Sequence, residues 1–106
     1  MKCYSVAETE ITGRGWVPEY VKKVTRMVEA RGGRFLARTS NVVKMAGEGK
    51  VPQVFLRIEW PSEETAKAFY ESEGYRPYRE RRVAGCKGEF LLVAGEDLTE
   101  PAHLRK

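Results

Sequence analysis

The order of hydrophobic and polar positions along the chain predicts a strand and then a helix in its first third. Residues 2–11 alternate loosely and are rich in strand-forming types, which predicts a first strand before the glycine-containing break at 12–15. Apolar residues then recur at the spacing of one helix face, and Pro18 suits the first turn of such a helix. Gly32 and Gly33 end it, because glycine commonly follows a helix. The apolar face of this helix consists of Val17, Tyr20, Val21, Val24, Met27 and Val28.

Two further strands are predicted after the first helix. Residues 34–46 are rich in strand-forming types, and their length indicates a bend or bulge near residues 40–41. Residues 47–50 contain two glycines and predict a hairpin turn, after which residues 51–60 predict the third strand. Pro52 belongs at the start of that strand because it cannot donate to a ladder of hydrogen bonds.

A second helical stretch and a fourth strand complete the pattern. Ser62 is the predicted N-cap, and the acids that follow it suit the positive end of the helix dipole. The stretch breaks at Gly74, resumes over residues 75–83 and is closed by Gly85. Residues 87–94 then predict the last strand.

The resulting order, βαββαβ, predicts an α+β fold of the ferredoxin-like type, with an antiparallel sheet and two helices on one face. We expect a single domain over residues 1–95 and a frayed, polar C-terminal tail over residues 96–106. Alternation in the third strand sends Val54, Leu56, Ile58 and Trp60 toward the helices, and Gln53, Phe55, Arg57 and Glu59 to the other face. Such a mixed face is covered by a partner sheet in some proteins and by water in others.

Composition narrows the classes of function. With 106 residues, 42% of them hydrophobic, the chain is one small domain with little room for a private deep cavity. Its net charge is +4, but basic and acidic residues are mixed along the chain. The densest basic run, residues 76–82, is interpreted first as a solvated helix face, then as an anion-binding segment, and last as a nucleic-acid contact. We do not expect a nucleic-acid partner, because the strands lack an RNA-binding aromatic motif.

Other chemical signals are mostly absent from the sequence. Cys3 and Cys86 have no CxxC spacing and are expected to stay reduced thiols, and His103 is the one histidine. No set of residues has metal-ligand spacing, and the short glycine turns match no phosphate-binding motif, so we expect neither a metal nor a cofactor. The chain carries no secretory signal and no apolar run long enough to cross a bilayer, so we expect a cytoplasmic protein with no membrane partner.

Several motifs, taken together, resemble a known family. The stretch Gly-Gly-Arg-Phe-Leu-Ala-Arg covers residues 32–38, Phe-Tyr-Glu-Ser-Glu-Gly-Tyr covers 69–75, Arg82 follows, and Leu-Leu-Val-Ala-Gly covers 91–95. Tyr20 and the Glu-Gly pair at residues 48–49 match as well. Over residues 3–95 the chain resembles the small bacterial family called domain of unknown function 1330.

The resemblance implies a dimeric α+β barrel, in which two ferredoxin-like sheets pack face to face, and hence a homodimer through the open sheet face. The wider superfamily includes small monooxygenases, lactone isomerases and heme-handling enzymes, and the resemblance implies no single reaction. Two places depart from the family pattern. Thr39 and Ser40 stand where glycine is common, and the entry to the first helix at residues 13–18 lacks the usual Asp-Pro.

One candidate ligand-binding group is predicted on the open sheet face. Arg38, Arg57 and Glu59 are expected to point away from the helices. As a structural group, an arginine and the glutamate would form a buried pair that sets register. As a functional group, an arginine would grip a carboxylate or enolate, and Glu59 would accept a proton if desolvation raised its pKa.

The second candidate group is aromatic and basic. Tyr70, Tyr75 and Arg82 match positions of the family resemblance. They would either cap the core, with Arg82 tied to a carbonyl or carboxylate, or line a pocket with a few orienting contacts. Trp16 and Trp60 are interpreted as core or interface packing.

These features lead to a functional hypothesis without a named ligand. We expect a dimeric protein that binds a small anionic organic molecule. The alternative is a cofactor-independent monooxygenase or isomerase that acts on an activated carbonyl substrate, and the sequence leaves open whether the protein is an enzyme.

Overall fold

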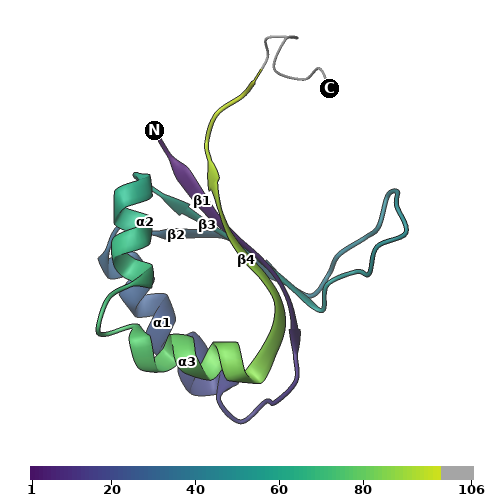
Figure 1. The fold of residues 1–106 in the computed structure, drawn as a ribbon, viewed down its shortest axis with the longest axis horizontal. Coiled ribbons are helices and arrows are strands. Elements are labelled where there is room, and N and C mark those ends of the chain that lie inside the picture. Colours follow the sequence, from purple (N-terminus) through teal and green to yellow (C-terminus); the bar gives the residue numbers. More distant parts are fainter. Residues whose placement is uncertain (99–106) are drawn as a thin grey trace.

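The structure, a computed structural model that describes residues 1–98, is a four-stranded antiparallel sheet with three helices on one of its faces (Figure 1). The strands follow the order β2-β3-β1-β4, with β3 and β4 on either side of β1. This confirms the α+β class and the antiparallel sheet; most of the expected tail lies outside the described residues. The elements are β1 (Cys3–Ile11), α1 (Val17–Ala30), β2 (Arg34–Thr39), β3 (Val54–Trp60), α2 (Glu63–Tyr70), α3 (Arg76–Gly85) and β4 (Cys86–Ala94).

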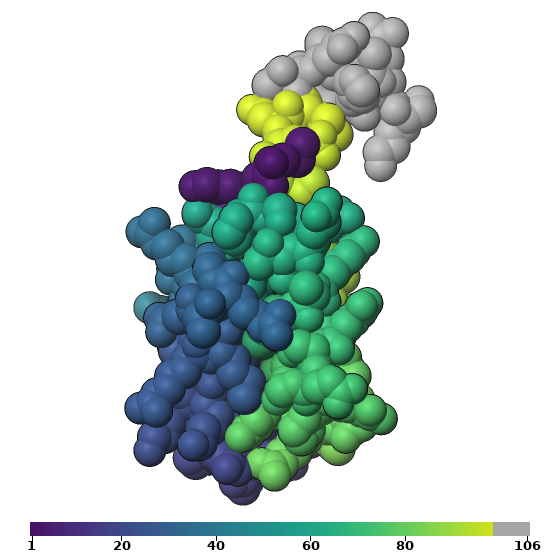
Figure 2. All heavy atoms as spheres, turned by 90° about the vertical axis from the view of Figure 1, so that its left-hand side faces the viewer, coloured from purple at the N-terminus to yellow at the C-terminus, as the bar shows by residue number. Residues whose placement is uncertain are grey.

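The helices begin and end close to where the sequence predicts. Pro18 lies in the first turn of α1, and Gly32 follows the helix with a φ of 87°, a conformation that favours glycine. The Ser62 hydroxyl caps α2 by accepting a hydrogen bond of 3.1 Å from the Thr65 N–H. The predicted break near Gly74 divides the second stretch into α2 and α3. Seen from the helix side, α1 and the α2–α3 pair lie next to one another over the sheet (Figure 2).

The two middle strands are shorter than predicted. β2 ends at Thr39 and β3 begins at Val54, and residues 40–53 form an arm that extends beyond the sheet (Figure 1). The side chains of Val43 and Met45 on this arm are 73% and 91% exposed. The prediction of strand across 40–46 and 51–53 is wrong because a two-stranded ribbon with no third strand or helix against it is marginally stable in water.

The core lies between the sheet and the helices. Ile58 and Trp60 are buried as expected, and the Trp60 indole N–H donates a hydrogen bond of 2.9 Å to the buried Ser5 hydroxyl. Gly33 passes directly under Trp60, where a Cβ atom would lie only 3.0 Å from the indole ring. The buried apolar side chains are Cys3, Ala7, Val24, Val28, Ile58, Trp60, Ala66, Phe69 and Tyr75.

The two cysteines lie on neighbouring strands but far apart. In the antiparallel register of β1 and β4, Cys3 is paired with Ala94 and Cys86 with Ile11, so the thiols sit at opposite ends of the sheet. Both are free. Among residues 1–98, no helix is long and apolar enough to cross a membrane, and no cluster of three potential metal ligands occurs.

Candidate functional site

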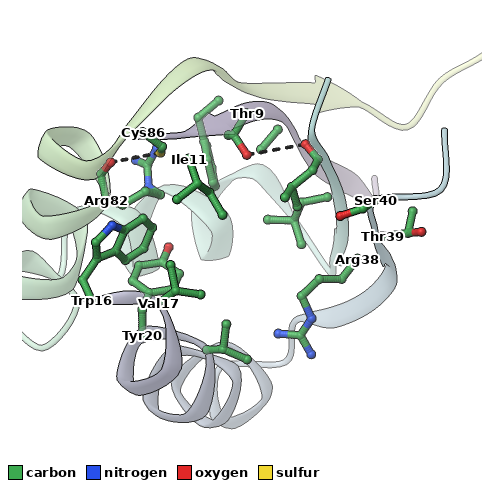
Figure 3. A pocket seen from close by; sticks show the side chains of 15 residues that line it. Thr9, Ile11, Trp16, Val17, Tyr20, Arg38, Thr39, Ser40, Arg82 and Cys86 are labelled. Atoms are coloured by element: carbon green, nitrogen blue, oxygen red, sulfur yellow. Dashed lines mark hydrogen bonds between the residues drawn. The ribbon is translucent and has the colours of Figure 1, made fainter. Parts of the chain in front are cut away.

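A cavity of about 300 Å³ opens between the helix-covered face of the sheet and the helices α1 and α3 (Figure 3). Its walls are mostly aliphatic and aromatic. The charged side chains among the lining residues are two arginines, Arg38 and Arg82, and neither an aspartate nor a glutamate is among them. The lining residues are Ala7, Thr9, Ile11, Trp16, Val17, Tyr20, Val21, Arg38, Thr39, Ser40, Val54, Leu56, Arg82, Cys86 and Phe90.

Arg82 is held at this cavity by tyrosine hydroxyls. Its Nη2 donates a hydrogen bond of 2.8 Å to the Tyr70 hydroxyl, and its Nε donates one of 3.3 Å to the Tyr75 hydroxyl. The guanidinium also lies over the Phe90 ring, 4.6 Å from the ring centroid. Arg82 is half-buried, and within residues 1–98 it makes no ion pair with a carboxylate.

The hydrogen bonds continue from Arg82 to Tyr20. The hydroxyls of Tyr75 and Tyr20 are 2.6 Å apart, and either could donate. The Tyr75 hydroxyl already accepts a hydrogen bond from Arg82, so its own O–H is best placed to donate a hydrogen bond to the Tyr20 hydroxyl. In that arrangement the Tyr20 proton is left to donate to another group, and Tyr20 lines the cavity whereas Tyr75 does not.

The electrostatics leave the cavity with positive charge and neutral donors. Burial raises the pKa of Tyr20 well above its ordinary value, with the neighbouring Tyr75 adding to the effect, so Tyr20 stays protonated. Burial works against the charged form of Arg82, but the tyrosine hydroxyls outweigh it and raise the pKa of the guanidinium, which remains a cation. Burial also raises the pKa of the Cys86 thiol. The thiol donates a 3.0 Å hydrogen bond to the backbone carbonyl of Arg82.

Trp16 supplies a wall of the cavity beside Arg82 (Figure 3). Its ring meets Tyr20 edge to face, with centroids 5.1 Å apart. Gly85 makes room for the indole, since a Cβ there would lie 2.1 Å from Nε1. The indole Nε1 is buried and has no hydrogen-bond partner within the described chain.

The second predicted group, Tyr70, Tyr75 and Arg82, is brought together by the fold. Its three members are joined by hydrogen bonds through the guanidinium. They lie in different parts of the structure: Arg82 lines the cavity, whereas Tyr75 is 1% exposed within the core. Tyr70 borders a neighbouring pocket between α2 and β4 instead. The two tyrosines therefore hold the arginine by hydrogen bonds without lining the cavity themselves.

The first predicted group is not brought together. A β-bulge between Phe35 and Ala37 leaves Leu36 as the extra residue, and beyond it Arg38 pairs with Leu56. Each residue of β2 after the bulge therefore points to the opposite face from the one that simple alternation predicts. Arg38 lies on the helix side, where its Nη1 donates a 2.7 Å hydrogen bond to the Thr25 hydroxyl. The expectation that it shares the open face is wrong.

Arg57 and Glu59 do lie on the open face, but they do not form the expected pair. Glu59 makes an ion pair of 2.8 Å with Lys2, and Arg57 stacks over the Tyr4 ring at 4.5 Å. The Lys2 ammonium holds the pKa of Glu59 below its ordinary value of 4.5. A carboxylate with a lowered pKa is a poor proton acceptor, so the hypothesis of a raised pKa is wrong.

Sequence reasoning missed Trp16 and Tyr20 as cavity residues. The sequence pattern places Tyr20 only on the apolar face of the first helix and among the family positions, and it places Trp16 only in packing. The available signal was their spacing of four residues, which places both rings on one side of the N-terminal turns of α1.

The comparisons with known proteins concern the whole of this fold. Residues 2–96 match the family described as Domain of unknown function (DUF1330). No curated protein matches the chain closely enough to count as a relative. Several solved structures share the fold at low sequence identity, which at this level speaks for the fold alone.

Three of these structures illustrate the range. A protein of unknown function from Rhodopseudomonas palustris has a TM-score of 0.72 at 13% identity, covering 91% of this chain and 83% of that one. SnoaB, a cofactor-independent oxygenase from Streptomyces nogalater, has a TM-score of 0.61 at 15% identity, with coverages of 93% and 98%. A putative antibiotic biosynthesis monooxygenase from Chloroflexus aurantiacus has a TM-score of 0.51 at 13% identity, with coverages of 92% and 99%. With nearly its whole length matched by the family model, the chain belongs to the DUF1330 family.

Proposed function

We propose that the protein binds a small organic anion with an apolar body in the cavity beside Arg82. The observation that carries this proposal is the state of that arginine. It is half-buried in an apolar cavity, and its side chain hydrogen-bonds only to neutral tyrosine hydroxyls within residues 1–98.

Tyrosine hydroxyls and the face of the Phe90 ring hold Arg82 in its charged form but bring no negative charge to the cavity. A ligand carboxylate or enolate supplies the missing charge and forms a charge-assisted hydrogen bond. The absence of acids from the lining residues favours the same class of ligand, because an anion meets no like charge there.

A thermal-shift screen of organic acids tests this function. Anions that bind should raise the melting temperature of the wild-type protein, and Arg82→Gln should abolish the shift while keeping a polar side chain of similar length. Arg76→Gln is the matched control, because Arg76 is an exposed residue of the same helix that pairs with Glu80. Equal shifts in Arg82→Gln and wild type would refute the site.

A second proposal concerns assembly: each chain is the ferredoxin-like half of a dimeric α+β barrel. Support comes from the face of the sheet opposite the helices, where Val6 is paired in register with Leu91, and Tyr4 with Val93. Leu91 and Val93 are 47% and 44% exposed on an edge strand. A second copy of the same sheet would cover these side chains and those of Phe55.

Analytical ultracentrifugation tests the dimer. We expect a two-fold mass at micromolar concentration, and a monomer for Leu91→Lys. Val83→Lys is the control, because Val83 is 63% exposed on α3 and lies away from the open sheet face. A monomeric wild-type protein at high concentration would contradict the proposal.

The alternative function is a cofactor-independent monooxygenase or isomerase acting on an activated carbonyl substrate. The fold similarity to SnoaB favours it, and the donors of Tyr20 and Arg82 are suited to an enolate oxygen. Oxygen uptake with enolisable 1,3-dicarbonyl and phenolic compounds distinguishes the two functions. Uptake that is lost in Arg82→Gln supports the alternative, whereas saturable binding without uptake or isomerisation supports binding alone.

A further inference from the structure

We infer that the ligand of the cavity is a hydrophobic monocarboxylate of about ten to twelve non-hydrogen atoms, sized from a cavity that is roughly twice a benzene-sized one. Its carboxylate would lie against Nη1 of Arg82 and the hydroxyl of Tyr20. This inference rests on the proposed binding function and names the ligand class of the same site.

The head of the ligand is defined by the donors that remain free. Two nitrogens of Arg82 are engaged, Nε with Tyr75 and Nη2 with Tyr70, and within residues 1–98 Nη1 has no hydrogen-bond partner. With Tyr75 accepting from Arg82, the Tyr20 hydroxyl accepts the hydrogen bond of the Tyr75 O–H and has its own O–H to donate. Two donors on the wall of one cavity match the two oxygens of a carboxylate.

We infer a single negative charge on the ligand because Arg38, unlike Arg82, is exposed to water. Its side chain is exposed at the opposite end of the cavity from Arg82 (Figure 3). It already bonds the Thr25 hydroxyl, and its guanidinium stacks 4.1 Å from the centroid of the Phe35 ring. Since water compensates this arginine, only Arg82 calls for a counter-charge, and a second carboxylate would gain little at the rim.

The body of the ligand is defined by the walls and the volume. The surface between the two arginines is largely aliphatic, with Val17 and Val21 of α1 on one side and Ile11, Val54, Leu56 and Phe90 of the sheet on the other. Few polar groups are present to replace the hydration of a sugar or a phosphate ester, so such ligands would bind poorly. A cavity of roughly 150 Å³ accepts one benzene ring, and about 300 Å³ therefore accepts a two-ring aryl group or a medium-length acyl chain.

The volume of the cavity also limits the size of the part of the ligand that can be buried. Toward the core, a small space of about 50 Å³ shares Tyr20, Leu56 and Phe90 with the cavity, and the separate pocket between α2 and β4 shares Phe90 with it. The small space is closed by the buried side chains of Phe69 and Tyr75, which line it. Longer chains must therefore extend out through the mouth into water, where added methylene groups contribute no further binding.

Calorimetric titration with straight-chain carboxylates of four to fourteen carbons, and with one- and two-ring aryl carboxylates, tests the inference. We expect affinity to rise about fourfold per methylene group and to level off near ten to twelve non-hydrogen atoms. The matched amides should bind at least about tenfold more weakly, as expected for a lost charge-assisted hydrogen bond. Val54→Phe, which narrows the cavity, should move the plateau to shorter chains, and Val43→Phe on the exposed arm should not.

Different results would contradict the proposed binding function and the proposed ligand class. If no organic anion binds, the proposed function fails. If small anions such as acetate bind as tightly as decanoate, or if dicarboxylates bind more tightly than monocarboxylates, the function stands and the ligand class is wrong. The length series on the wild-type protein decides the question even if Val54→Phe does not fold.

Discussion

Removing the hydroxyl of Tyr75 is the sharpest test of the hydrogen-bonded tyrosine cluster. Tyr75 is 1% exposed, and its hydroxyl is the link between Tyr20 at 2.6 Å and Arg82 at 3.3 Å. Tyr75→Phe keeps the ring, which packs at 4.5 Å between centroids on Phe69. The substitution therefore removes two hydrogen bonds and little else.

The expected loss of unfolding free energy can be worked out from the two hydrogen bonds that the substitution removes. A neutral hydrogen bond contributes about 1 kcal/mol and one to a charged group about 1.5–3 kcal/mol. Arg82 is only half-buried, so water recovers part of the second contribution. We expect Tyr75→Phe to lower the free energy of unfolding by about 2 kcal/mol. For a domain of this size, that loss corresponds to a melting temperature about 10 °C lower.

Urea and thermal denaturation followed by circular dichroism measure this loss. Tyr78→Phe is the matched control: Tyr78 is half-buried, and its hydroxyl makes no hydrogen bond within the described residues. We expect its free energy of unfolding to change by less than about 0.5 kcal/mol. If Tyr75→Phe is no more destabilising than Tyr78→Phe, the hydrogen-bonded cluster does not contribute as argued.

Two further predictions concern the sheet. Gly88 has a φ of 129°, and a Cβ there would lie 2.0 Å from the Glu8 carbonyl oxygen, so Gly88→Ala should cost more than about 2 kcal/mol in urea denaturation. Gly74→Ala, with open space around it and a negative φ, should cost less than about 0.5 kcal/mol, and equal costs would disprove the close approach. Because Lys2 lowers the pKa of Glu59 in the folded state, their pair stabilises the protein above the ordinary pKa of 4.5 and loses its effect as the pH falls. The difference in unfolding free energy between wild type and Glu59→Gln should therefore shrink between about pH 5 and pH 3, and a difference independent of pH would contradict it.

Local patterns predicted most of the secondary structure because its causes are local. The helical spacing of apolar residues, the cap at Ser62 and the break near Gly74 each act within a few residues of chain. The arm at residues 40–53 is different, since strand-forming composition alone cannot supply the neighbouring strand that a ladder needs.

The candidate site was predicted in part. Arg82 and its two supporting tyrosines were recognised from motif positions, and the fold joins them. The face on which Arg38 lies depends on one extra residue at the bulge, which no alternation pattern reveals. Trp16 and Tyr20 are site residues because the packing of α1 against the sheet places them beside the cavity, and this packing is not visible in the local sequence.

By itself the sequence determined the α+β class, the order of the elements, the direction of the third strand's side chains and the family motifs. Tertiary structure decided which arginine needs a counter-charge. Arg38 and Arg82 are chemically the same, but Arg38 is exposed to water, whereas Arg82 is half-buried among neutral hydroxyls. The free energy of a charge depends on its surroundings, and these come from segments far apart in the chain. A domain of this size has little room for a deep private cavity, and the space of about 300 Å³ that it holds between α1, α3 and the sheet is open to water on one side.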